Sequence, residues 1–127
     1  EALESYQRMI AKVPHDPVPY YYAGLSLTAL KRHSEAIVQY EKALELAPNW
    51  LDAYYNLANA FSDIGNYAKA LYYYELASQL APNNASVFLD WSVALKRTGQ
   101  LERAQEKRQR ALQLKPSFAS MPVVSGS

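Results

Sequence analysis

Few side chains in this sequence could carry out chemistry, and none of them forms a recognisable catalytic group. There is no cysteine, and the two histidines, His15 and His33, fall in predicted turns, where a lone imidazole is normally solvated. Glu41 and Glu45 are four residues apart, which is the spacing of a solvated helix face. The sequence contains no glycine-rich phosphate loop and no metal-ligand cluster. It therefore predicts no enzyme, no cofactor and no metal site.

The charged residues are unevenly distributed, although the net charge is only +1. Residues 1–63 contain 5 basic and 8 acidic residues, whereas residues 64–127 contain 8 basic and 4 acidic residues. Most of the basic excess lies between Lys96 and Lys115, in what we expect to be one helical stretch. Because Glu102 and Glu106 interrupt it and no aromatic residue lies within it to stack on a base, a solvated helix face is favoured over nucleic-acid binding.

Tyrosine is the most distinctive residue type, with 11 copies in 127 residues. Several are adjacent, as in the runs 20–22, 54–55 and 72–74. Adjacent residues on a helix point about 100° apart, so these rings cannot all face one core. Some are therefore predicted to be exposed, where tyrosine supplies rigid contact area with a polar tip for binding another polypeptide.

The elements that position these residues follow a repeat of about 34 residues. Prolines recur at one constant spacing, at Pro14, Pro48, Pro82 and Pro116. If each proline ends a second helix, each repeat contains two antiparallel helices. Their large and small apolar residues then recur at spacings of three, four and seven, which place them on one helix face.

Small residues mark the predicted contacts between helices. Position 8 of the repeat is Gly24, Ala58 or Ser92, and a small residue there lets the partner helix approach closely. Positions 20 and 27 are alanine in every full repeat, and position 24 is aromatic in the first two; these residues are Ala36, Ala70, Ala104, Ala43, Ala77, Ala111, Tyr40 and Tyr74.

This pattern resembles the tetratricopeptide repeat family across nearly the whole chain before Ala119. The resemblance implies an all-α fold, an α-solenoid of antiparallel helix pairs. The predicted units are a second helix of a preceding repeat at residues 1–16, full repeats at 17–50, 51–84 and 85–118, and a non-repeat tail at 119–127. The half-repeat and the absence of an initiator methionine indicate a piece of a longer protein.

Two positions depart from the pattern. Gly65 and Gly99 are expected to end the first helix of their repeats in the left-handed conformation, but Lys31 replaces glycine in the first repeat, so we expect its turn to differ. Arg108 replaces the aromatic residue of the last second helix. This indicates either a capping helix that faces water or a side chain whose aliphatic part covers apolar surface.

In tetratricopeptide proteins the first helices line a concave face, and their exposed positions contact ligands. Transferred by this resemblance, together with Asn56, whose amide could bond to a ligand backbone, the predicted groove consists of Tyr21, Leu25, Thr28, Asp52, Tyr55, Asn56, Asn59, Ser62, Leu89, Val93, Lys96 and Arg97.

The predicted function is a protein-interaction scaffold that binds an extended or helical peptide segment in this groove, with Lys96 and Arg97 meeting acidic side chains. The alternative is a structural or spacer segment that self-associates through the solenoid ends or the tail. A clamp for the carboxylate terminus of chaperones is not expected, because Tyr21, Leu25, Ser86 and Asp90 stand where that clamp needs lysine, asparagine or arginine.

Two further expectations concern the surroundings of the domain. No apolar run is long enough to cross a membrane, so no membrane insertion is predicted; the compartment stays open, with the cytoplasm as the default. We expect the tail, residues 119–127, to lie extended against a groove of its own or a neighbouring copy, unless it is vector-derived.

Overall fold

The computed structural model describes residues 2–120 of the chain. This part consists of helices and turns and contains no β-strand. The elements are α1 (Ala2–Lys12), α2 (Pro17–Ala29), α3 (His33–Leu46), α4 (Leu51–Asp63), α5 (Tyr67–Leu80), α6 (Ala85–Arg97), α7 (Leu101–Leu114) and the 3-10 helix η1 (Pro116–Ser120).

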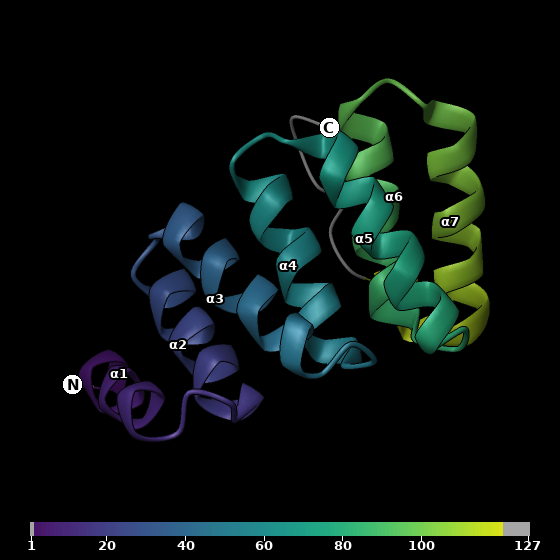
Figure 1. Cartoon of the computed structure of the whole chain (residues 1–127). Helices are drawn as coiled ribbons and strands as arrows, with labels where there is room; N and C mark the ends of the chain where they lie inside the picture. Colours follow the sequence, from purple (N-terminus) through teal and green to yellow (C-terminus); the bar gives the residue numbers. More distant parts are fainter. Residues whose placement is uncertain (1, 121–127) are drawn as a thin grey trace.

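The helices pack in chain order, each against the next (Figure 1). The helices α2, α4 and α6 have 13 residues each, and the helices α3, α5 and α7 have 14. In addition, α4 and α6 contact each other directly across the repeat boundary. The prediction of an all-α solenoid of helix pairs is confirmed.

The predicted small residues form the contacts between paired helices. All six alanines at positions 20 and 27 of the full repeats are buried. Gly24 lies directly against the ring of Tyr40, which is fully buried, and a Cβ atom at Gly24 would stand 2.5 Å from the Cε1 atom of that ring. Only a residue without a side chain allows this approach of α2 and α3.

Side chains and prolines determine where several helices begin. The Asp16 carboxylate accepts a hydrogen bond from the Val18 amide at 3.0 Å, and the Asn84 side chain accepts one from the Val87 amide at 3.2 Å. Pro17 occupies the first turn of α2, where its missing amide proton costs no helical hydrogen bond. The tyrosine hydroxyls of Tyr20 and Tyr54 then tie each first helix to the preceding proline carbonyl, at 2.9 Å in both repeats.

The prediction that the turn at Lys31 differs is wrong. Lys31 has a φ of 63°, in the same left-handed region as Gly65 at 83° and Gly99 at 80°. The residue after each of them donates to an equivalent carbonyl, as in the hydrogen bonds from Arg32 to Leu27 and from Asn66 to Phe61, both 2.9 Å. The turn geometry is therefore retained and Lys31 adopts a conformation that suits glycine.

The C-terminal region differs from the expectation in one respect. The basic residues do not lie in one helical stretch, because the turn at Gly99 separates Lys96 and Arg97, which end α6, from those of α7. Arg108 is half-buried in α7. Residue 119 belongs to η1, and residues 121–127 of the predicted tail lie outside the described residues.

Candidate functional site

A pocket of about 550 Å³ opens between the first helices of the repeats. Side chains from α2, α4, α5 and α6 line it. Six of the predicted groove residues lie in its wall, namely Thr28, Asn56, Asn59, Ser62, Val93 and Arg97. Five further residues complete the wall, namely Ala60, Asp63, Tyr67, Tyr74 and Asp90. The structure thus brings residues from three consecutive repeats to one cavity.

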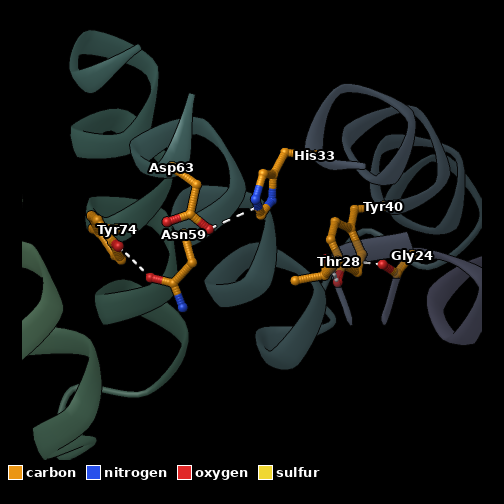
Figure 2. A network of polar contacts seen from close by, with 7 residues as sticks. All are labelled: Gly24, Thr28, His33, Tyr40, Asn59, Asp63 and Tyr74. Carbon is orange, nitrogen blue, oxygen red and sulfur yellow. Dashed lines mark hydrogen bonds and ion pairs between the residues drawn. The ribbon is translucent and has the colours of Figure 1, made fainter. Parts of the chain in front are cut away.

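Hydrogen bonds between helices hold the polar residues of the pocket in place (Figure 2). The hydroxyl of Tyr74, which is 2% exposed, donates to the Asn59 side-chain oxygen. Thr28 donates to the Gly24 carbonyl at 2.9 Å, and its oxygen lies 2.9 Å from the Tyr40 hydroxyl. Because threonine has a single hydroxyl proton, Tyr40 must be the donor of the second bond.

Asp90 connects the second and third full repeats. The Tyr55 hydroxyl on α4 donates to Asp90 Oδ2 on α6. Burial raises the pKa of Asp90 above its ordinary value and the charge of Asp63 raises it further, while the hydrogen bond from Tyr55 acts in the opposite direction. The pKa of Tyr55 is also raised, by burial first and then by the bond and charge of Asp90. Asp90 is therefore a carboxylate that the Tyr55 hydroxyl holds in place and that is partly shielded from water.

The Asn56 side chain can offer a ligand only a hydrogen-bond acceptor. Its amide nitrogen donates to the Tyr21 hydroxyl at 3.1 Å and to the Asp52 carbonyl at 2.9 Å. These two bonds use both of its protons, so its side-chain oxygen is the atom left for a ligand. An acceptor at this point can bind a backbone amide of an extended segment.

Other predicted groove residues lie outside the pocket wall: Tyr21, Leu25, Asp52, Tyr55, Leu89 and Lys96. Tyr21 is only 8% exposed, its ring centroid is 4.5 Å from that of Trp50, and it offers little contact area. Burial, with the charge of Asp52 as the next cause, raises the pKa of Tyr21 to about 12. The tyrosines that are exposed from the runs are Tyr22 and Tyr72.

Residues from α5 and one acidic residue of α6 were missed by sequence reasoning. Tyr67 and Tyr74 belong to a second helix, and the rule that first helices line the groove does not consider them. Asp90 occupies the same repeat position as Asn56, one repeat later, so that position was a usable signal. Asp63 was not missed, because the resemblance places a ligand-contacting position of the repeat at this residue, the last of α4.

The described part of the chain holds no group of three His, Asp or Glu residues placed to bind a metal ion. None of its helices is long and apolar enough to cross a membrane. Stacked helix pairs with a polar pocket shared by three repeats define the class of helical-repeat solenoids.

Two family models place the chain within this class. A model described as TPR repeat matches residues 24–65, and a model described as Tetratricopeptide repeat matches residues 51–84. The resemblance inferred from the proline and alanine spacing is confirmed, and the chain contains tetratricopeptide repeats over residues 24–84. Such repeats are protein-interaction scaffolds and are generally not enzymes.

Solved structures of proteins named MamA have a similar fold. One, described as the crystal structure of MamA, has a TM-score of 0.86 and 22% identity, and the match covers 94% of this chain and 70% of that chain. A MamA RS-1 double mutant has a TM-score of 0.86 and 29% identity over 90% of this chain and 64% of that chain. The chain thus spans about two thirds of the length of these structures. A comparison with curated proteins gives no match.

Proposed function

We propose that the pocket binds an extended or helical segment of a partner protein. The observation that carries this proposal is the shared wall: Thr28, Asn59 and Val93 come from three consecutive repeats and line one cavity. A segment that crosses the first helices of the three repeats would contact all three side chains at once. The side-chain oxygen of Asn56 would accept a backbone hydrogen bond from it, and Arg97 would meet an acidic side chain.

A peptide-display selection against the wild type tests this proposal, with two tryptophan variants as a matched pair. Ser62 lines the pocket, and Ser62→Trp would fill it with a large ring. Ser34 is exposed at the start of α3 outside the pocket, so Ser34→Trp adds the same ring without blocking the cavity. Circular dichroism would establish that both variants keep the helical fold.

We expect the wild type and Ser34→Trp to bind the enriched peptides with equal affinity and Ser62→Trp to bind them at least about tenfold more weakly, a loss of about 1.4 kcal/mol. Enrichment of no motif, or equal binding by both variants, would refute the proposal that the pocket is the binding site.

Self-association is a second candidate, and the exposed apolar side chains of the first two helices support it. Met9 and Val13 lie on or just after α1, and Val18 and Tyr22 lie on α2, and each is between 41% and 44% exposed. Their burial between two copies would be favourable. Static light scattering at several concentrations tests this: a mass that rises with concentration, and falls back in Val18→Ser/Tyr22→Ser, is expected, whereas a monomer throughout contradicts it.

A further inference from the structure

The pocket contains two carboxylates that come from different helices. Asp63 is the last residue of α4, and Asp90 lies within α6. Both line the cavity together with the Asn59 and Tyr74 pair, and the charge of Asp63 is close enough to raise the pKa of Asp90. In Figure 2 Asp63 lies beside Asn59, and Tyr74 reaches Asn59 from the neighbouring helix. Negative charge is therefore concentrated at one part of the pocket.

No lysine or arginine of the described residues pairs with either carboxylate. Asp90 accepts one hydrogen bond, from Tyr55, and makes no ion pair within residues 2–120. The nearest basic group to Asp63 is the His33 imidazole, with Nδ1 3.6 Å from Oδ2, and it is charged only when protonated. Arg97 lines the same pocket but pairs with neither aspartate.

The surroundings of the two carboxylates favour a positive ligand. The C-terminal end of α4 adds partial negative charge next to Asp63, since the peptide dipoles of a helix leave its carbonyl end negative. Half of the Asp63 side chain is exposed, so a ligand can reach it. Asp90 is partly desolvated, which strengthens its attraction for a cation relative to an exposed carboxylate. Tyr67 also lines the pocket, and tyrosine rings attract cations.

From this geometry we infer that the pocket recognises a basic side chain, arginine or lysine, that the bound segment inserts between Asp63 and Asp90. The inference rests on the proposed function and names the chemistry of the partner. An arginine fits this arrangement well, because its planar guanidinium can donate to two carboxylates at once and stack on an aromatic ring. Arg97, which lines the same pocket and pairs with neither aspartate, would then meet an acidic residue of the same segment.

The test uses the peptides selected by the wild type. We expect them to share one position occupied by arginine or lysine, and replacement of that residue by citrulline, a neutral isostere of arginine, should weaken binding at least about tenfold, the discrimination that follows from losing about 1.4 kcal/mol. Selections against Asp63→Asn and Asp90→Asn should lose the preference for a basic residue at this position. The residue preferences at the other positions of the peptide should stay the same. Asparagine retains the shape and the acceptor oxygen, so the Tyr55 bond to position 90 can persist.

Glu75→Gln is the charge control, because Glu75 is exposed on α5 and does not line the pocket. It should enrich the same peptides as the wild type. A motif without a basic position, or a basic preference that survives both asparagine variants, overturns this inference while leaving the proposed function intact. If the wild type enriches nothing, the proposed function fails and this inference fails with it.

Discussion

Asp90 is a residue at which binding and stability are expected to conflict. Because burial raises its pKa, the folded protein holds the proton more tightly than the unfolded chain does. Stability from this group is therefore fully present below the ordinary aspartate pKa of about 3.9 and is lost as the pH rises through the raised folded value. At neutral pH the ionised form opposes folding.

Asp90→Asn should consequently raise the free energy of unfolding at pH 7, and this gain should disappear below about pH 4, where aspartate is protonated in both states. Urea denaturation of both proteins at several pH values measures the difference. Asp63→Asn is the comparison, because that side chain is half exposed and no comparable gain is expected. An Asp90→Asn variant that is less stable at pH 7 would show that the ionised carboxylate is needed for folding.

Replacing Gly24 by alanine has two opposing effects on stability, a gain in helix propensity and a steric cost. An alanine in a helix interior is favoured over glycine by about 1 kcal/mol, but the new Cβ would lie 2.5 Å from the buried Tyr40 ring. Overpacking of this kind costs about 1–3 kcal/mol.

We expect Gly24→Ala to lower the free energy of unfolding by up to about 2 kcal/mol, because the steric cost exceeds the gain in propensity. Chemical denaturation measures it, and Ser26→Ala, on the same helix, is the control. A more stable Gly24→Ala protein would show that α2 and α3 can separate without loss.

At the level of residues, the candidate site was predictable where it depends on repeat position and not where it depends on packing. Asn59 and Val93 follow from their places on first helices. Tyr74 does not, because it lies on the second helix of its repeat, where packing brings it into the pocket wall and its hydroxyl bonds to Asn59. Whether Tyr21 is exposed or buried likewise depends on Trp50, which lies beyond α3 in the chain and packs its ring against that of Tyr21.

At the level of elements, the turns after the first helices are the parts of the fold most open to improvement. A left-handed conformation costs a residue with a side chain about 1–2 kcal/mol, and glycine gives back about 0.5–1 kcal/mol through the entropy of the unfolded chain. Lys31 carries this cost, whereas Gly65 and Gly99 do not.

Lys31→Gly should therefore increase the free energy of unfolding by about 0.5–1 kcal/mol. The reciprocal variant, Gly65→Ala, should lower the free energy of unfolding by a similar amount. No atom lies within 4 Å of the added Cβ, so the left-handed conformation is the source of the cost. Thermal and urea denaturation of the two variants test the pair together. No gain in Lys31→Gly would mean that the lysine side chain makes a compensating contribution.

The helices themselves were predictable because local and repeat signals agree. Proline spacing, alanine positions and tyrosine rings all indicated the same boundaries, and the first helices start at the same position of each repeat, at Pro17, Leu51 and Ala85. The turn at Lys31 was misjudged because residue type was weighed without the neighbouring hydrogen bonds, which impose one geometry on all three turns.

At the level of the whole molecule, some of the basic side chains of α7 contact aromatic rings of the same chain. Lys107 lies 4.2 Å from the centre of the Trp91 ring, and Arg110 lies 5.9 Å from that of Phe88. These contacts join α7 to α6 and give the cations a packing role. The pocket, in contrast, contains two carboxylates, Asp63 and Asp90, that pair with no lysine or arginine of the described residues.

Because residues of α2, α4, α5 and α6 line the pocket, a bound segment should stabilise several repeats together. At a free peptide concentration of about 100 times Kd, binding to the native state alone adds about 2.7 kcal/mol to the free energy of unfolding. Hydrogen exchange should then show slower exchange in α2, α4 and α6 alike, including the amides near Thr28 and Val93. Ser62→Trp with the same peptide is the control and should show no added protection. Protection confined to one helix pair would mean that the segment contacts a single repeat, and that the three-repeat wall of the pocket does not act as one site.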